Sequence, residues 1–495
     1  MLIKHYQNEL IDDFEHREAK RTFFLVPTKP LVDQQAKQIQ TWTSLRVGQF
    51  TGQTEIEEKG KVIGIDFWSK EMWKEKFKKY HVLVMTPQIL LRLLTHRQIH
   101  LSKINLIVFD EAHWAGPKRN LAKSNHDYTQ IVDYIRNQVN EHQPRILGLS
   151  ASLIKNKVNP ERIRQYVKVF EQSFNAKCLT VYGIEDLGDK STNPREILWC
   201  FASDSIIACS LVNNILSKVF EFLDSLIQEY ESQNHIQYAD TDSNKEELNI
   251  RITTKLPLGP SKLKLCLEQI YEILIEMGPW CGENVIKYFS DYFDYILNLY
   301  GHIIPPYKEI LDSFLQILET CRSILKEFMS EMTEQQKLID FVSPKMKRLL
   351  ELLLNFKNND EKLDKQICGL VFVQRRAECK TLTSWLTELK KYDPDNFGFM
   401  EVGYAVGISN QPGFLKSLVS STQKTQTRTL EEFRSGKKNL LIATSVLEEG
   451  LDVGGCNLVV RYDFPHTLRD YLQSKGRARN NDSHYVLFCP EKERY

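Results

Sequence analysis

The segment Leu106-Ile107-Val108-Phe109-Asp110-Glu111-Ala112-His113 decides how the first part of the chain is interpreted. Four consecutive apolar residues predict a strand that is buried on both faces, as in a parallel sheet. Two carboxylates follow at once, and α/β folds bind ligands at the carboxyl edge of such a sheet. One carboxylate can hold Mg²⁺ through water while its neighbour acts as a general base, so Asp110 and Glu111 are candidate catalytic residues. The alternative is a solvated helix N-terminus, where acidic residues are common.

Similar patterns surround this segment. Further short apolar runs are separated by helical stretches and occur at residues 22–26, 81–85 and 146–149. This alternation predicts a doubly wound α/β domain over residues 1–200. Hydroxyl side chains follow the three runs, namely Thr28, Thr86, Ser150 and Ser152. Hydroxyls beside helix N-termini can hold phosphate oxygens without reading bases, although each one alone is equally typical of a turn or a helix cap.

The rest of the chain divides into two further regions. Between residues 201 and 340, apolar residues recur every three to four positions and predict an all-helical domain, with stripes at 207–226, 263–277, 285–300 and 310–328 and an exposed polar loop at 231–247. Strand–helix alternation returns over residues 341–495, with strands predicted at 370–373, 440–443, 458–461 and 485–488. The predicted fold class is therefore α/β, with two parallel-sheet domains and a helical insertion between them.

Composition limits the classes of function. The 495 residues include 65 Lys and Arg against 64 Asp and Glu, and a net charge of +1 excludes a uniformly basic shell, so any nucleic-acid contact must be local. No apolar run reaches the roughly 20 residues of a membrane-spanning helix. The 10 cysteines form no C-x-x-C pair, which disfavours a zinc site and fits a reducing, cytoplasmic compartment. Leu2, Ile3, Tyr6 and Leu10 predict an amphipathic helix at the start of the chain.

The third region contains the more specific motifs. The predicted strand at 440–443 leads into Thr444-Ser445-Val446-Leu447-Glu448-Glu449-Gly450-Leu451-Asp452, and Gln473-Ser474-Lys475-Gly476-Arg477-Ala478-Arg479 follows. Two arginines beside a glutamine suit a group that reaches a transferring phosphoryl group. The alternatives are a basic solvated helix face and an RNA-backbone patch, which the ordered combination of motifs disfavours.

In this order, the motifs at 110–113, 150–152, 443–452 and 473–479 resemble motifs II, III, V and VI of superfamily 2 RNA helicases. Such proteins have two RecA-like domains, with ATP between them and nucleic acid across their top. The helical insertion and several segments resemble the helicase region of Dicer proteins, namely 277–281, 341–345, 371–376, 457–465 and 471–479. The resemblance implies ATP, Mg²⁺ and double-stranded RNA as ligands, a role in RNA silencing, and an insertion that can dock a double-stranded-RNA-binding partner protein.

The resemblance also implies roles for single residues. Asp110 would bind Mg²⁺ through water, Glu111 would orient or deprotonate the attacking water, and His113 would couple motif II to motifs III and VI. Ser150 and Ser152 would link nucleotide state to domain closure. The residues that would approach ATP and its phosphates are Gly450, Asp452, Gln473, Arg477 and Arg479, and those that would contact RNA backbone are Thr28, Thr86, Gln374, Arg375 and Thr444. Gly-Arg-Ala-Arg is one residue shorter than the Gly-Arg-x-x-Arg of many helicases, which leaves open which arginine is the finger.

One motif is missing from the sequence. ATP hydrolysis needs G-x-x-x-x-G-K-[ST], and neither Gly60-Lys61-Val62 nor Gly436-Lys437-Lys438 fits it. The leading hypothesis is the ATP-dependent, double-stranded-RNA-binding helicase module of a Dicer-type endoribonuclease, present as a fragment without the phosphate loop or ribonuclease III domains. Two alternatives stay open: an ATPase-inactive module that binds RNA or a partner protein, and an antiviral-receptor-type RNA helicase.

Overall fold

The structure is a computed structural model that describes residues 2–58, 61–117, 125–138, 142–154, 159–179, 193–202, 260–300, 305–360, 367–406, 423–444, 453–480 and 482–491. The chain forms two compact units, one mainly of residues 1–191 and the other mainly of residues 192–495. The predicted helical stripe at 207–226, the predicted loop at 231–247, and Gly450 and Asp452 lie outside the described residues.

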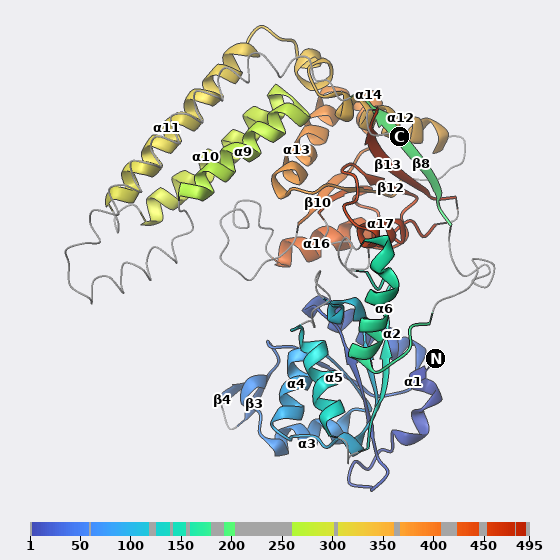
Figure 1. The fold of residues 1–495 in the computed structure, drawn as a ribbon. Helices are drawn as coiled ribbons and strands as arrows, with labels where there is room; N and C mark the ends of the chain where they lie inside the picture. Colours follow the sequence, from blue (N-terminus) through green and yellow to red (C-terminus); the bar gives the residue numbers. More distant parts are fainter. Residues whose placement is uncertain are drawn as a thin grey trace. The chain divides into compact units, whose positions relative to one another are not determined.

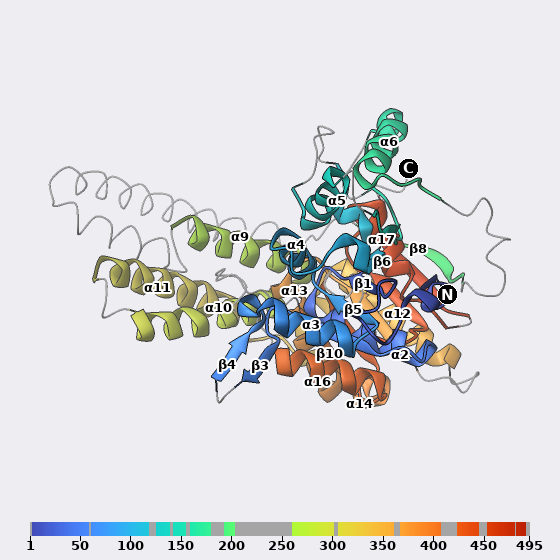
Figure 2. The same cartoon turned by 90° about the horizontal axis from the view of Figure 1, so that it is seen from below.

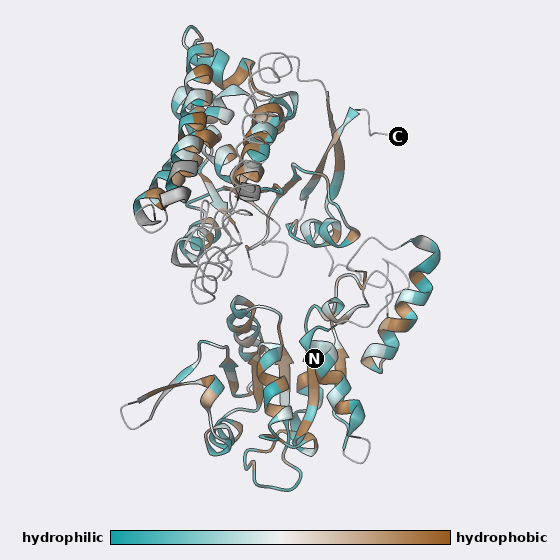
Figure 3. Ribbon diagram, turned by 60° about the vertical axis from the view of Figure 1, so that its left-hand side comes forward, coloured by the Kyte–Doolittle hydropathy of each residue, from teal (hydrophilic) through white to brown (hydrophobic). Residues whose placement is uncertain are grey.

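The first unit is built on a five-stranded parallel sheet (Figure 1). Its strands lie in the order β2-β5-β1-β6-β7, which are Val47–Phe50, Val82–Met85, Arg21–Leu25, Ile104–Phe109 and Arg145–Gly148. Side chains alternate between two hydrophobic cores: Phe23 and Leu25 belong to one, and Phe24 and Val26 to the other. Both faces are thus covered, which explains why the central strands are continuous apolar runs, as their hydropathy colouring shows (Figure 3).

Helices cover the two faces of this sheet. The helices are α1 (Leu2–His5), α2 (Lys29–Trp42), α3 (Lys70–Lys79), α4 (Pro87–Thr95), α5 (Asp127–Asn137) and α6 (Ile163–Phe174), with 3-10 helices η1 (Gln7–Glu9), η2 (Ile65–Phe67), η3 (Leu101–Lys103), η4 (Ala112–Ala115) and η5 (Pro160–Arg162). Helix α2 packs into one core, and α3, α4, α5 and α6 pack into the other. A separate antiparallel hairpin consists of β3 (Glu55–Glu58) and β4 (Lys61–Gly64), seen from below in Figure 2.

The start of the chain differs from its prediction. In place of one amphipathic helix there is a single α-helical turn, α1, followed by the 3-10 helix η1. Leu10 is buried, whereas Leu2 is exposed. A helix this short has too few hydrogen bonds to be stable alone, so contacts further along the chain fix the path of this segment.

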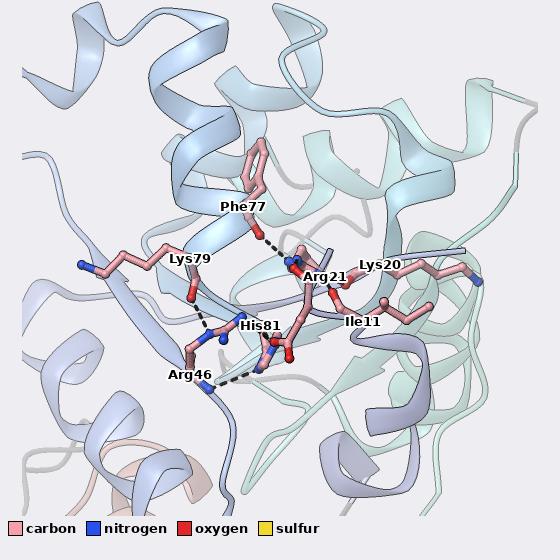
Figure 4. Close-up of polar contacts among 8 residues, drawn as sticks. Ile11, Lys20, Arg21, Arg46, Phe77, Lys79 and His81 are labelled. Carbon is pink, nitrogen blue, oxygen red and sulfur yellow. Dashed lines mark hydrogen bonds and ion pairs between the residues drawn. The ribbon is translucent and has the colours of Figure 1, made fainter. Parts of the chain in front are cut away.

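Arg21 provides the central contact (Figure 4). Its buried guanidinium donates to the carbonyl oxygens of Phe77 at 2.5 Å, Ile11 at 2.9 Å and Lys20 at 2.6 Å. Burial lowers the pKa of Arg21 to about 10, and it stays charged at neutral pH. Because a buried charge is tolerated only with such partners, Arg21 ties the N-terminal segment to the amino end of β1 and to α3.

The second unit contains a six-stranded parallel sheet. Its strands lie in the order β10-β11-β9-β12-β13-β8, which are Val402–Ala405, Leu440–Ala443, Gly369–Phe372, Leu458–Arg461, His484–Pro490 and Arg195–Phe201. Sequence analysis assigns residues 195–200 to the first domain, whereas β8 pairs in parallel with β13 of the second sheet. Strand β8 is an edge strand, and local sequence does not specify which sheet an edge strand joins.

The second unit contains the long helices of the insertion and the helices around the second sheet. The helices are α9 (Pro260–Met277), α10 (Pro279–Tyr300), α11 (Pro305–Phe328), α12 (Pro344–Asp360), α13 (Arg376–Tyr392), α14 (Pro394–Phe397), α16 (Gln423–Arg434) and α17 (Leu468–Lys475), with a π-helical turn, η7 (Gln336–Asp340). Helices α9 to α12 each begin at proline, which lacks the N–H that a first turn leaves unpaired. Ile270 of α9, Phe293 of α10, Phe314 of α11 and Val371 of β9 belong to one continuous core.

These observations confirm the predicted fold class. The chain is α/β, with two parallel-sheet domains and helices between them in sequence. Within the described ranges, none of the helices combines the length and the hydrophobicity needed to cross a lipid bilayer.

Candidate functional site

The predicted polar residues of the first unit follow four neighbouring strands at one edge. Strands β5, β1, β6 and β7 are adjacent and parallel, so their carboxyl ends point the same way. Within three residues of these ends come, in the same order, Thr86, Thr28, Asp110 and Ser150. The fold therefore brings together on one edge side chains that are up to 122 residues apart in sequence, from Thr28 to Ser150.

Asp110 is held at the centre of this edge. Its Oδ2 accepts from Gln35 Nε2 at 3.2 Å, its Oδ1 accepts from the backbone N–H of Glu111 at 3.1 Å, and its own N–H donates to the carbonyl of Leu25 at 2.9 Å. Burial, and next the charge of Glu111, raise the pKa of Asp110 to about 6. The site therefore concentrates negative charge that a cation would stabilise.

Glu111 turns the chain back toward the site. Its backbone lies in the left-handed region, at φ 51° and ψ 47°, which is rare for a residue with a side chain. This turn starts η4 and places Glu111 Oε2 at 3.2 Å from His113 Nδ1. Backbone strain of this kind persists where the surroundings enforce it, and it is frequent at functional sites.

His113 connects this turn to the end of β7. Its side chain is 1% exposed, and Nδ1 lies 2.9 Å from Ser150 Oγ. Because Ser150 Oγ donates its own hydrogen to the carbonyl of Ser152 at 2.6 Å, we infer that His113 Nδ1 carries a hydrogen and donates it to Ser150. Nε2 of His113 is buried and has no hydrogen-bond partner among the described residues. Motif II residues 111 and 113 and motif III residues 150 and 152 thus form one chain of polar contacts.

Two supporting residues were missed by sequence analysis. Tyr128 of α5 is fully buried, and its hydroxyl faces the carbonyl oxygens of Leu25 at 3.2 Å and Asp110 at 2.8 Å, so it joins the ends of β1 and β6. Gln35 of α2 binds the Asp110 carboxylate from the other side. Neither residue stands in a motif, and only the helical spacing of α2 and α5 after the strands could have suggested them.

Close packing also fixes this turn. A Cβ at Gly116 would lie 2.6 Å from Tyr166 Oη and 2.9 Å from the carbonyl oxygen of His113. A Cβ at Gly148 would lie 3.0 Å from the Cβ of Ala112. Both glycines therefore allow η4 to pack closely against α6 and β7.

Thr28 and Thr86 are the N-cap residues of α2 and α4. Both have extended backbone conformations and are half-buried, and neither side chain makes a capping hydrogen bond. Their hydroxyls stand at the first turn of a helix, a position that suits phosphate oxygens.

In the second unit, the predicted RNA contacts follow the adjacent strands β9 and β11. Thr444 follows β11 and is buried, and its N–H donates to the carbonyl of Ala405 at 3.2 Å. Gln374 follows β9 and is exposed, and its N–H donates to Asp463 Oδ2 at 2.7 Å. Arg375 is paired within the protein, with Glu276 at 3.2 Å and Glu272 at 3.1 Å.

The motif VI residues differ in exposure. Arg477 is 5% exposed and Gln473 is 8% exposed, and neither amide atom of Gln473 has a hydrogen-bond partner among the described residues. Arg479 is exposed, and its Nε donates to the carbonyl of Gly476 at 3.1 Å. The structure thus gives the two arginines distinct surroundings.

Comparison with known proteins identifies the class. Residues 2–159 match the DEAD/DEAH box helicase family, and residues 344–481 match the helicase conserved C-terminal domain. A structural comparison finds the Hef helicase domain of Pyrococcus furiosus, with 21% identity, a TM-score of 0.46, and coverage of 95% of this chain and 87% of that chain. With both helicase domains present, the chain belongs to the superfamily 2 helicases.

The curated relatives define the type within that class. The chain is 30% identical to endoribonuclease dcr-1 of Caenorhabditis elegans, covering 100% of this chain and 24% of that protein. It is 29% identical to endoribonuclease Dicer of Xenopus tropicalis, covering 99% and 26%, and 30% identical to Dicer homolog 2a of Oryza sativa subsp. japonica, covering 98% and 31%. The chain thus spans about a quarter of the length of the first two relatives, and it is a helicase region of the Dicer type.

A DEAD/DEAH box domain implies ATP, usually with Mg²⁺, and the first unit offers residues that fit the ion. Asp110 and Glu111 are adjacent carboxylates, Asp110 has a raised pKa, and Glu111 Oε2 is buried without a hydrogen-bond partner among the described residues. Asp110 would hold Mg²⁺ through water beside the Glu111 carboxylate, and the ion when bound neutralises phosphate charge.

Proposed function

We propose that this chain grips double-stranded RNA as the helicase module of a Dicer-type endoribonuclease. One observation carries the proposal: Thr86, Thr28, Asp110 and Ser150 follow four adjacent strands at a single edge of the first sheet. The two threonines present uncapped hydroxyls at helix N-termini, which suits a phosphate backbone. Thr444 and Gln374 follow adjacent strands at the carboxyl edge of the second sheet and extend the same role.

Duplex RNA fits this kind of site better than a base-reading ligand. Duplex RNA is recognised by its shape, its 2′-hydroxyls and its phosphates, because side chains cannot read its deep, narrow major groove. Backbone contacts from hydroxyls do not need a strongly basic protein, and this chain has a net charge of +1. The proposal includes a role in RNA silencing in the cytoplasm and docking of a double-stranded-RNA-binding partner on the helical insertion.

The same proposal assigns the ATP chemistry to named residues. Asp110 would hold Mg²⁺ through water, and Glu111 would orient or deprotonate the attacking water. His113 would couple motif II to motifs III and VI, and Ser150 and Ser152 would link nucleotide state to domain closure. The residues proposed to face ATP from the second RecA-like domain are Gly450, Asp452, Gln473, Arg477 and Arg479. The proposed domains are residues 1–200, 201–340 and 341–495, except that residues 195–201, which form β8, pair with the sheet of the last domain.

A second candidate function is favoured by one feature of the sequence. The 495 residues contain no G-x-x-x-x-G-K-[ST] motif, so residues 1–495 would bind RNA or a partner protein without turning over ATP. RNA binding is common to both candidates, and ATP turnover separates them. The similarity to Dicer proteins over 97–100% of the chain disfavours an antiviral-receptor-type helicase.

Fluorescence anisotropy with a blunt RNA duplex tests the proposal. The double substitution Thr28→Ala and Thr86→Ala should weaken RNA binding about three- to tenfold, because each substitution removes one proposed hydrogen bond to the phosphate backbone of the RNA. The matched control is Thr41→Ala with Thr95→Ala, at the opposite ends of the same helices, where each hydroxyl bonds to its own helix. Equal losses in the two variants, or equal affinity for a DNA duplex of the same sequence, would reject the proposal.

A further inference from the structure

Arg375 lies at a proposed RNA-contact position, but its side chain is already paired with acidic residues. It follows β9 at the carboxyl edge of the second sheet, beside Gln374 and at the N-terminus of α13, where an RNA phosphate would lie in the proposed function. Yet its guanidinium is bound by the helical insertion: Nη1 to Glu276 Oε2 at 3.2 Å and Nη2 to Glu272 Oε2 at 3.1 Å. We call these three side chains the Arg375 clasp.

The two carboxylates of the clasp occupy the donors that a phosphate would use. Glu272 and Glu276 are four residues apart on α9 and therefore lie on one face of the helix. Each binds a different terminal nitrogen of Arg375, and carboxylates and phosphates use the same fork of guanidinium donors. A phosphate that takes the Nη1–Nη2 fork of Arg375 must therefore replace at least one of the two glutamates.

The side chains of the clasp are accessible enough to solvent for a phosphate to replace a glutamate. The side chain of Arg375 is 28% exposed, and those of Glu272 and Glu276 are 43% and 38% exposed. The nearby pair of Lys345 and Asp463 is different, because its side chains are only 13% and 12% exposed. Partly exposed ion pairs contribute little to stability and are easily replaced, whereas a buried pair is costly to break.

Contacts other than the two ion pairs of the clasp hold the backbone beside Arg375. Asp463 Oδ2 accepts the N–H of Gln374 at 2.7 Å, and Asp463 Oδ1 is held by Lys345 Nζ at 2.6 Å. The Glu378 side chain, 1% exposed, lies in the same group, where oxygens of Glu276, Glu378 and Asp463 are within 4.8 Å of one another. The Arg375 side chain can therefore change partners while the loop that carries it stays in place.

We propose that the Arg375 clasp is an autoinhibitory contact in which Glu272 and Glu276 of the insertion compete with RNA phosphates for Arg375. This rests on the proposed binding of duplex RNA. When RNA engages the edge of the second sheet, Arg375 passes from the glutamates to a phosphate, and α9 loses one of its ties to α13. RNA binding and release of the insertion are thereby linked through one guanidinium.

The test compares two variants that remove the same charge. Glu272→Gln with Glu276→Gln frees Arg375, and we expect duplex RNA to bind about three- to tenfold more tightly, the factor for releasing two partly exposed ion pairs. The matched control is Glu283→Gln with Glu319→Gln, which frees Arg322 of α11 from the same kind of pairing, at 2.7 Å and 3.7 Å. The control should change RNA affinity less than twofold.

Arg375→Ala completes the cycle. In the Arg375→Ala background, the substitutions at Glu272 and Glu276 should give no gain in RNA affinity beyond that of the control. With Arg375 present, the same two substitutions should steepen the slope of log affinity against log salt concentration by about 0.9, because one more phosphate is neutralised. A gain that persists without Arg375, or a gain no larger than the control, overturns the clasp. Failure of every variant to bind duplex RNA overturns the proposed function itself, whereas equal binding by wild type and the clasp variant overturns only the clasp.

Discussion

Asp110 occupies a position where an ionised carboxylate is poorly stabilised. It lies mostly buried at the end of β6 and beside Glu111, and two hydrogen bonds only partly offset these effects. Sequence analysis predicts Asp110, Glu111 and His113 because they directly follow an apolar strand. It does not predict Gln35 or Tyr128, because these residues contact Asp110 only through folding, across 75 and 18 residues of sequence.

The first prediction concerns the pH dependence of Asp110. Its pKa rises from 3.8 to about 6 on folding. The contribution of the protonated carboxyl group to the free energy of unfolding is therefore fully present below pH 3.8 and is lost as the pH rises through about 6. Asp110→Asn, which cannot ionise, should match wild type near pH 3.8 and exceed it by up to about 3 kcal/mol at pH 7.5. Denaturant unfolding at both pH values, without divalent cations, measures this difference. Equal stabilities of the two proteins at pH 7.5 would show that ionisation of Asp110 does not destabilise the folded protein.

At the scale of elements, the site is a strand, a left-handed turn and the short helix η4. The positions of the long helices of the insertion are predictable, because α10 and α11 begin at prolines that interrupt apolar stripes. Strands β2 and β10 were not predicted. Each has four residues and contains a glycine, Gly48 or Gly403, which weakens the strand pattern.

The second prediction tests the packing of η4. Gly116→Ala would place a Cβ 2.6 Å from Tyr166 Oη and 2.9 Å from the His113 carbonyl, so η4 must shift. We expect a loss of about 1–3 kcal/mol in the free energy of unfolding, the usual cost of overpacking. Gly52→Ala is the control, because nothing lies within 4 Å of its added Cβ. Equal stability of the two variants would mean that η4 moves without cost.

At the scale of the molecule, the order of α/β, helical and α/β regions was predictable from the alternation of apolar patterns. The sheet to which β8 belongs was not predictable, because an insertion follows β8 and its partner β13 lies almost 300 residues later. The insertion also packs in one core with the second sheet, and local periodicity does not reveal such shared packing.

The third prediction concerns ATP turnover by residues 1–495. Without a phosphate loop, we expect little or no hydrolysis of ATP with duplex RNA present, because preorganised donors to phosphate oxygens stabilise the transition state by several kcal/mol. Phosphate release by the purified chain measures this. Robust RNA-stimulated turnover that Glu111→Gln abolishes would contradict the prediction and would favour a complete motor.

The central claim of the proposed function is that duplex RNA binds at the carboxyl edge of each sheet. Amide hydrogen exchange of residues 1–495, with and without a blunt RNA duplex, tests it most directly. We predict slower exchange in the segments that follow the strands, at 28–31, 86–89, 150–153 and 373–376. Slower exchange confined to the opposite edge, for instance at Leu101–Lys103 before β6, with these four segments unchanged, would contradict the account.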